Sequence, residues 1–276
     1  MDHFKWEKIW SWWLEEDMPN GDITTDSIFQ ATDIANGYWL VKEEGVVAGM
    51  DVATSLFTYL DPSIHIEWLA REGDFVPKDF ILGRISGPVI PILKGERLTL
   101  NLMQHLSGIA TMSHQFANLV APYSAKVVDT RKTLPGLREL EKRAVWLGGC
   151  YNHRRNLSES VLIKDNHIQA LGGIAKVMEH IKRRIPHTMK IEIEVDNIED
   201  FRVAKEYGAD IVLLDNMHPD DMKVIVEENQ HEIILEASGN VTLDNLENVA
   251  QSGVDYISVG ALTHSAKALD MSLKLI

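Results

Sequence analysis

The sequence predicts an α/β protein in which a parallel barrel follows a smaller α+β region. In the second half, short apolar strands alternate with amphipathic helices, and strands begin about 20–23 residues apart, as in repeated strand–helix units. Between residues 36 and 94, short strands instead follow one another around a single helix. Polar residues stand where the later strands end, which is where barrel enzymes carry their chemistry.

The first region begins with a helix. Residues 4–16 place Trp6, Trp10 and Trp13 at helical spacing with Asp2 as an available N-cap, and we interpret the tryptophans as core or subunit interface. Residues 18–25 are expected to form a loop. Strands are expected at residues 38–42, 46–48, 64–69, 80–86 and 89–93, with a helix near 52–60.

A long helix is expected from Gly95 to Val120. Arg97 falls in its first turn, where a cation is unfavourable against the helix dipole. Two interpretations stay open: Arg97 serves a partner elsewhere, or it is simply exposed.

The second region carries the alternating pattern. Its strands are expected at residues 126–129, 161–164, 190–195, 211–214, 233–237 and 256–259, and its helices at 137–147, 198–207, 219–229 and 243–252.

Carboxylates follow one face of the strand at 190–196, where they alternate with apolar residues. If the apolar face meets the helices, Glu192 and Glu194 point into the barrel, and buried carboxylates need cations or a metal. Asp215 ends the next strand, so Glu194 and Asp215 could share a Mg²⁺ ion. The alternative is internal ion pairing with Lys164 or Lys190.

Small residues end the last two strands, at Ser238-Gly239-Asn240 and at Gly260. Small residues before a helix expose backbone N–H groups to a phosphate, and the last two loops of barrels often do this. Ordinary turns are the alternative interpretation.

Basic residues concentrate between Asp129 and His167, although 27 basic and 41 acidic residues give the whole chain a net charge of −14. This island contains Arg131, Lys132, Arg138, His153, Arg154 and Lys164. Because arginine matches carboxylates bidentately, such groups on different elements suit a ligand with two carboxylates. His153 could be a donor or a base. Lys142, Arg143 and Arg155 are expected on the solvated surface, and Cys150 as a small buried residue.

The composition narrows the possible partners and location. The acidic balance argues against nucleic acid and anionic membranes as partners. A single cysteine excludes an intrachain disulfide and suits a reducing cytoplasm. We expect no signal peptide and no membrane span.

Several segments, in order, resemble the quinolinate phosphoribosyltransferase family, also called nicotinate-nucleotide pyrophosphorylase (carboxylating). They are Gly21–Thr25, Asp129–Arg138, Gly148–Arg154, Leu162–His167, Leu213–Asn216 and Val259–Ser265. The resemblance implies a type II phosphoribosyltransferase fold. Its N-terminal α/β sandwich would span residues 1–110 with a C-terminal strand at 268–276, and its incomplete α/β barrel would span residues 111–267.

The resemblance also implies an activity: quinolinate and phosphoribosyl pyrophosphate give nicotinate mononucleotide, pyrophosphate and CO₂, in de novo NAD biosynthesis. The enzyme would be a Mg²⁺-dependent pentosyltransferase, cytoplasmic, and a homodimer or hexamer with shared active sites. Two positions depart from the family's usual glycines, Cys150 and Asn240. Asn tolerates positive φ, so the phosphate loop is expected to survive.

Matching positions imply the site residues. Quinolinate would meet Arg131, Lys132, His153, Arg154 and Lys164, with Arg97 from the neighbouring subunit. Glu194 and Asp215 would hold the ribose and Mg²⁺, and Lys132, Lys164, Glu194 and Asp215 would be catalytic. Ser238, Gly239, Asn240 and Gly260 would bind the 5′-phosphate. The rivals are a phosphoribosyltransferase for another pyridine acid, such as nicotinate, and a non-enzymatic anion-binding module.

Overall fold

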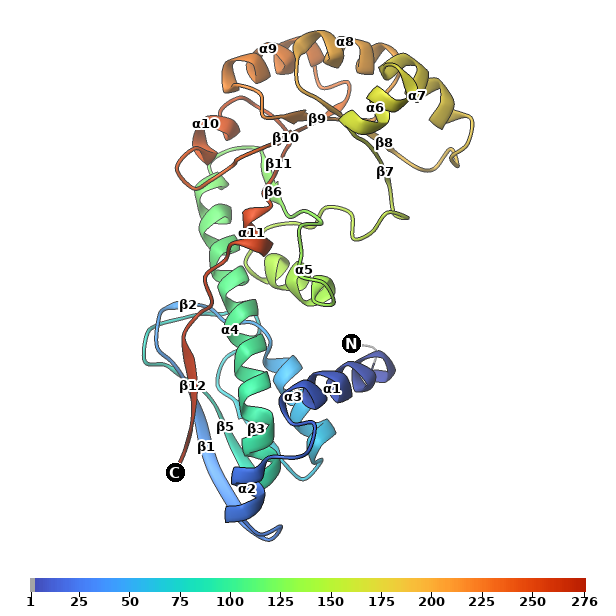
Figure 1. Cartoon of the computed structure of the whole chain (residues 1–276). Coiled ribbons are helices and arrows are strands. Elements are labelled where there is room, and N and C mark those ends of the chain that lie inside the picture. The colour runs from blue at the N-terminus through green and yellow to red at the C-terminus, as the bar shows by residue number, and fades with distance from the viewer. Residues whose placement is uncertain (1–2) are drawn as a thin grey trace. The chain divides into compact units, whose positions relative to one another are not determined.

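The computed structural model describes residues 3–276, so the expected N-cap Asp2 lies outside the described residues. The chain divides into two compact units (Figure 1). One comprises Met1–Thr111 with Ala266–Ile276, and the other comprises Met112–Ser265. Each unit is described by itself.

The first unit is built on an antiparallel sheet. Its order is β12 (Met271–Leu275), β1 (Ile34–Val41), β5 (Ile81–Pro88) and β3 (His65–Trp68). A separate pair joins β2 (Gly45–Val46) to β4 (Phe75–Val76). The helices are α1 (His3–Asp17), α2 (Ile23–Ile28), α3 (Met50–Leu60) and the first part of α4 (Val89–Val120). The last strand of the chain therefore completes the sheet at the edge beside β1.

Aromatic residues fill the core of this unit. Trp39 is fully buried, with its ring centroid 6.0 Å from Phe57 and 4.7 Å from Trp68. On α1, Trp6 and Trp10 are buried and stack with centroids 5.1 Å apart. The core interpretation therefore holds for these two residues of the tryptophan stripe.

A half-buried carboxylate caps α3. Glu72 accepts hydrogen bonds from the backbone N–H groups of Gly49, at 3.0 Å, and Asp51, at 2.9 Å. These donors belong to the helix N-terminus, where the backbone has no helical acceptors. Burial raises the pKa of Glu72 to about 7, even though both backbone hydrogen bonds favour the carboxylate. Helix α3 is thus fixed by a residue outside it.

Two expectations in this unit were wrong. Residues 18–25 are not all loop, because α2 begins at Ile23, where the Asp22 side chain accepts from the Thr25 N–H at 3.1 Å. Residues 89–93 are helical rather than a strand: a short buried apolar run has no period that separates the two, and Pro91 is tolerated in a first helical turn. Arg97 therefore lies two turns into α4 and is exposed. The helix-dipole argument for Arg97 is thereby removed.

The second unit contains a six-stranded parallel sheet. Its order is β6 (Lys126–Val128), β11 (Tyr256–Ser258), β10 (Ile234–Ser238), β9 (Ile211–Asp215), β8 (Ile191–Val195) and β7 (Val161–Ile163). All five pairings are parallel. Among the described strands, β6 and β7 end this order without pairing to each other. The predicted fold class, an incomplete parallel barrel with a separate N-terminal α/β unit, is confirmed.

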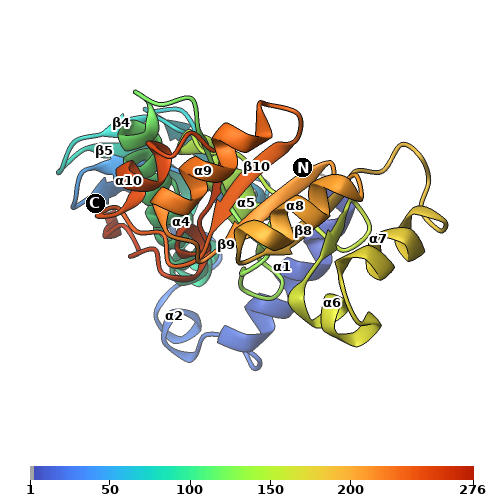
Figure 2. The ribbon, with the colours of Figure 1, turned by 90° about the horizontal axis from the view of Figure 1, so that it is seen from above.

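Helices accompany the strands of this unit. They are α5 (Arg138–Leu147), α6 (Asp165–Leu171), α7 (Ile174–Lys182), α8 (Ile198–Glu206), α9 (Pro219–Asn229), α10 (Leu246–Ala250) and α11 (Ala261–His264). Figures 1 and 2 show α8 and α9 beside β8, β9 and β10, on one face of the sheet. The other face of these strands is therefore free to carry polar side chains. Among the described residues, no helix combines the length and apolar character that crossing a bilayer requires.

Candidate active site

A cavity of about 530 Å³ lies in the second unit at the carboxyl ends of the parallel strands. It is lined by Thr130, Arg131, Lys132, His153, Arg154, Leu162, Lys164, Glu194, Leu213, Asp215, Asn216, Glu236, Ser238, Gly239, Asn240 and Ser258. These residues come from at least five strand ends, as expected for a barrel site. Cations, carboxylates and a small-residue loop therefore share one hollow.

A buried ion pair supports the cavity. Asp129 follows β6 and is fully buried, and Lys142 on α5, 1 % exposed, donates to it at 2.5 Å. Asp129 also accepts from the Asn152 side chain and from the His153 N–H, both at 2.8 Å, while Lys142 donates to the His153 carbonyl at 2.9 Å. The pair thus fixes the backbone that carries His153 and Arg154.

The surface location expected for Lys142 was wrong. Leu140, Ala144 and Val145 are also buried, so Lys142 belongs to the inner face of α5. Burial raises the pKa of Asp129 and lowers the pKa of Lys142, and their mutual hydrogen bond opposes both shifts. Lys142 is buried because it pairs with Asp129 on another segment, and a local sequence pattern does not predict such a contact.

Two guanidinium groups line the cavity beside each other. Arg154 donates to the Ser160 carbonyl at 2.8 Å, and its pKa is lowered first by burial and then by the positive charge of Arg131. The Arg131 Nε is buried and has no hydrogen-bond partner among the described residues. A buried donor without a partner is costly. Two neighbouring guanidinium groups, one of them with a buried N–H that has no acceptor among the described residues, indicate a binding site for an anion.

Lys164 and Glu194, at the adjacent strands β7 and β8, form an ion pair at 3.2 Å in the wall of the cavity. Lys164 follows β7, where its backbone N–H donates to the His167 ring, and it is half exposed, whereas Glu194 projects from β8 and is mostly covered. The internal ion pair that was the alternative to a metal is therefore present. Glu194 still offers an oxygen that Lys164 does not contact at this distance.

The loops after β9 and β10 interlock. Asn216 donates to Asp215 at 2.7 Å and accepts from the Asn240 side chain at 3.0 Å. Gly239 has φ +98°, and a Cβ there would lie 2.2 Å from the Asn216 side-chain oxygen and 2.8 Å from its backbone nitrogen. Asn240 has φ +50°, so the expectation that asparagine tolerates this position is confirmed.

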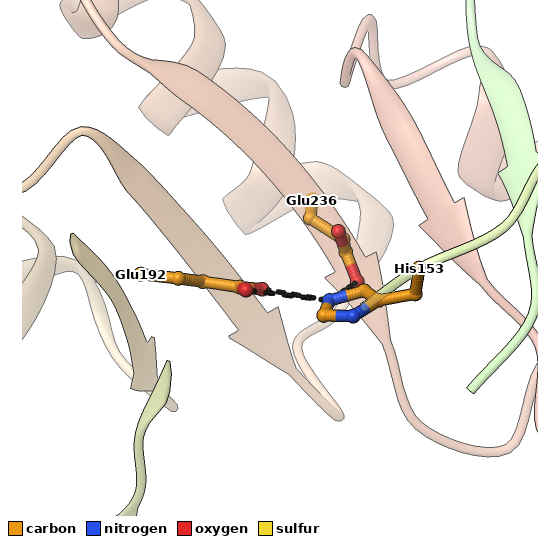
Figure 3. A group of neighbouring side chains, drawn as sticks. All are labelled: His153, Glu192 and Glu236. Carbon is orange, nitrogen blue, oxygen red and sulfur yellow. Dashed lines mark hydrogen bonds and ion pairs between the residues drawn. The ribbon is translucent and has the colours of Figure 1, made fainter. Parts of the chain in front are cut away.

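His153 lies between two buried carboxylates inside the barrel (Figure 3). Its Nε2 is 3.3 Å from both oxygens of Glu192 on β8, and 3.6 Å from Oε1 of Glu236 on β10. The Arg154 N–H donates to Nδ1 at 2.7 Å, so the neutral ring carries its proton on Nε2, facing the carboxylates. Burial works against the imidazolium, but the Glu192 hydrogen bond and the charges of Glu236 and Glu192 raise the pKa of His153 overall.

Glu236 is the least satisfied member of this trio. A distance of 3.6 Å is too long for a hydrogen bond, and Oε1 has no hydrogen-bond partner among the described residues. Burial raises the pKa of Glu236 to about 7, with a further contribution from the Glu192 charge. The trio is the one group of three possible metal ligands found in the part of the chain described. Its imidazole makes it a poor match for Mg²⁺, which prefers oxygen ligands.

Both units match a known family. Residues 109–274 match the family described as quinolinate phosphoribosyl transferase, C-terminal domain, and residues 22–107 match the corresponding N-terminal domain. The chain belongs to the quinolinate phosphoribosyltransferase family. The resemblance inferred from the motifs is therefore confirmed.

Relatives of this family are similar over nearly the whole chain. The probable nicotinate-nucleotide pyrophosphorylase (carboxylating) of Synechocystis sp. is 41% identical, over 96% of this chain and 90% of its own length. The corresponding probable enzyme of Bacillus subtilis is 39% identical, over 99% of this chain and 94% of its own. The structure of the nicotinate-nucleotide pyrophosphorylase from Francisella tularensis superposes with a TM-score of 0.95 at 36% identity, covering 100% of this chain and 98% of that one.

Ten of the twelve residues that the family motifs indicated line the cavity. The exceptions are Arg97, which is exposed on α4 in the first unit, and Gly260, which is the N-cap of α11. A Cβ on Gly260 would lie 2.9 Å from the Lys132 side chain, so Gly260 borders a lining residue. Arg138 of the basic island is also outside the lining; it donates to the Thr133 side chain and the Arg155 carbonyl.

Sequence reasoning missed Glu236 and the pairing role of Asn216. Glu236 stands between Leu235 and Ala237 on β10, with the same alternation that points Glu192 inward from β8. Strand phase was therefore an available signal for Glu236. The hydrogen bonds of Asn216 depend on two loops meeting, and no local pattern predicts that.

Proposed function

We propose that this chain catalyses phosphoribosyl transfer from phosphoribosyl pyrophosphate to quinolinate, with release of pyrophosphate and CO₂ and formation of nicotinate mononucleotide. It is thus a decarboxylating pentosyltransferase of de novo NAD biosynthesis. The observation that carries this proposal is the cavity in which paired guanidiniums face carboxylates at strand ends. The names of the relatives over nearly the whole chain support the same substrates.

Quinolinate occupies the cationic part of the cavity. Arg131 and Arg154 bind its carboxylates, the unmet Arg131 Nε supplying one donor, and Lys132 and Lys164 add positive charge. The Thr263 hydroxyl donates to the Lys132 carbonyl at 2.7 Å, which fixes the segment that carries both Arg131 and Lys132. His153 has both ring nitrogens engaged. It therefore contributes by holding Arg154 rather than by offering a free N–H group.

Phosphoribosyl pyrophosphate occupies the acidic and small-residue part. Ser238, Gly239 and Asn240 receive the 5′-phosphate, with Gly260 at the next strand end. Glu194 and Asp215 face the ribose hydroxyls. During transfer, positive charge develops at the ribose carbon that is attacked, and the carboxylate of Glu194 offsets it in a partly dehydrated site.

The carboxylates of this cavity fit a magnesium ion. Glu194 and Asp215 present oxygen donors from adjacent strands, and Mg²⁺ is commonly bound by one or two carboxylates together with substrate phosphates. Each of these carboxylates already has a protein partner, Lys164 or Asn216, so substrate oxygens would complete the coordination. When bound, the ion supplies charge neutralisation for the departing pyrophosphate.

The proposal extends to assembly and location. The chain forms a homo-oligomer, a dimer or a hexamer, in which the exposed Arg97 reaches the active site of a neighbouring subunit. The first unit is the N-terminal sandwich and the second is the catalytic barrel. The single cysteine, which is buried, supports a cytoplasmic location.

The direct test is an assay with purified protein, quinolinate, phosphoribosyl pyrophosphate and Mg²⁺, in which CO₂ and nicotinate mononucleotide are both measured. We expect Arg131→Ala or Arg154→Ala to weaken quinolinate binding about 10–150-fold, because a charged hydrogen bond contributes roughly 1.5–3 kcal/mol. Arg183→Ala, at an exposed arginine in the same unit, is the matched control. Unchanged quinolinate affinity in both cavity variants would remove the proposed binding mode, and a preference for nicotinate would favour the rival substrate.

A further inference from the structure

The proposed reaction requires one proton that no substrate supplies. When CO₂ leaves quinolinate, the bond between the ring carbon and the carboxylate breaks, and its electron pair stays on that carbon. The product carries hydrogen there, so an acid must deliver a proton. Until it does, CO₂ can recombine with the carbanion.

Acids inside the cavity are few once their geometry is considered. Arginine is effectively never deprotonated in proteins. The ring proton of His153 faces Glu192. Lys132 is exposed to water, and the Lys164 ammonium pairs with Glu194 at 3.2 Å. Glu194 and Asp215 also line the cavity, but they are only partly buried and face the ribose in the proposed function. Glu236 is therefore the remaining buried carboxyl group among the described lining residues.

Glu236 is built as a neutral acid. It is 5 % exposed, projects inward from β10, and has an oxygen with no hydrogen-bond partner among the described residues. An ionised carboxylate left in that condition is strongly disfavoured. Resting on the proposed function, we propose that the Glu236 carboxyl group is the acid that protonates the ring carbon from which CO₂ departs.

The surroundings of Glu236 favour this role. Glu192 on β8 repels its ionised form, while His153 and the Ser258 hydroxyl on β11 favour that form; on the adjacent β9, the residue in register is Leu213, which does not titrate. Burial dominates, and the pKa of Glu236 is raised to about 7. An acid with a pKa near the working pH both releases a proton readily and regains it.

The step balances without another reactant. The O–H bond of Glu236 breaks, a C–H bond forms at the ring carbon, and Glu236 is left as a carboxylate. His153 and Glu236 lie close enough for electrostatic stabilisation of that carboxylate, with 3.6 Å between their nearest atoms. A proton from water then restores the acid, because CO₂ release has consumed one proton overall.

The test is a single-turnover experiment that follows pyrophosphate and CO₂ separately in Glu236→Gln and in the native enzyme. Glutamine keeps the shape but is not an acid. We expect pyrophosphate to form within about threefold of the native rate, whereas CO₂ release slows about 100-fold or more, since general acid catalysis contributes typically 10²–10⁴-fold. The phosphoribosylated, still dicarboxylated intermediate should accumulate. Glu236→Asp, which restores an acid, should recover part of the CO₂ rate, and Glu247→Gln, at an exposed site, should behave as native.

Three results would overturn the inference. The first is CO₂ release in Glu236→Gln that keeps pace with pyrophosphate release at the native rate. The second is an equal slowing of both products, which would mean that Glu236 has a structural role, and the third is that Glu236→Asp recovers none of the CO₂ rate. If Glu236→Gln does not fold, the test is the pH dependence of CO₂ release by the native enzyme. This step should slow as pH rises through about 7. A rate of CO₂ release that does not change with pH would overturn the proposal. Native protein that releases neither product from these substrates contradicts the proposed function itself. The two failures are therefore distinguishable.

Discussion

Replacing Lys142 with methionine tests the buried ion pair beneath the cavity. Methionine keeps most of the length of the unbranched side chain and removes its charge. Asp129, which is fully buried, would then lose the cation that contacts it at 2.5 Å. Breaking a buried pair by removing one partner costs about 3–5 kcal/mol, because an uncompensated charge remains inside. The loss is a large part of the roughly 5–15 kcal/mol by which a domain is stable.

The measurement is urea unfolding followed by circular dichroism at pH 7, with Lys176→Met, at an exposed lysine on α7, as the matched control. We expect the control to change the unfolding free energy by less than about 0.5 kcal/mol. Quinolinate binding should also weaken in Lys142→Met, since Lys142 holds the His153 carbonyl at 2.9 Å, next to Arg154.

A double-mutant cycle with Asp129→Asn separates the ion pair from lost packing. In Asp129→Asn the buried Lys142 ammonium has already lost its carboxylate, and adding Lys142→Met removes that uncompensated charge. Lys142→Met should therefore cost much less in this background than in the native protein. We expect a coupling free energy of about 2 kcal/mol or more, within the range measured for contacting residues. The reasoning is refuted if Lys142→Met costs under about 1 kcal/mol, or costs the same in both backgrounds.

Three further predictions concern Glu72, Gly239 and Cys150. The folded-state pKa of Glu72 is raised from 4.5 to about 7, so its contribution to stability is full below about pH 4.5 and is lost as pH rises through 7. The melting temperature should therefore fall over this pH range, and Glu72→Gln should make the fall smaller. An unchanged fall in Glu72→Gln would contradict the assignment. Gly239→Ala should raise the KM for phosphoribosyl pyrophosphate, since its Cβ would collide with Asn216, whereas Gly173→Ala, also at positive φ but in open space, should affect stability alone; equal KM values would refute this steric role. Burial raises the pKa of the Cys150 thiol to about 12, so this buried thiol should resist iodoacetamide at pH 8 until urea unfolds the protein. Alkylated Cys150 detected by mass spectrometry in the folded protein would contradict this prediction.

The order and type of most elements followed from periodicity in the sequence. The strands at β8, β9, β10 and β11 were predicted to within about two residues, because each is a short apolar run closed by a turn. Residues 89–93 show where this reasoning ends. An apolar run of that length suits a strand or a buried helix equally, and only the packing of α4 selected the helix.

Some features of the candidate site could likewise be predicted from the sequence, and others could not. Strand phase placed Glu192 and Glu194 on the inner face, and it would have placed Glu236 there had it been applied to β10. The alternation of inward and outward residues along strands could not show that Lys142, on helix α5, is buried. Its partner, Asp129, is thirteen residues away on another element, and a contact between elements leaves no trace in a local pattern.

By itself, the sequence determined which chemistry the chain carries: an acidic protein with a cationic island, family motifs, and polar residues at the ends of parallel strands. Tertiary structure alone decided how those groups are paired. It put Lys164 against Glu194, left the Arg131 Nε without a hydrogen-bond partner among residues 3–276, and enclosed His153 between Glu192 and Glu236. The physical reason is that side-chain identity and strand phase are local properties, whereas desolvation and charge pairing depend on which distant segments the folded sheet brings together.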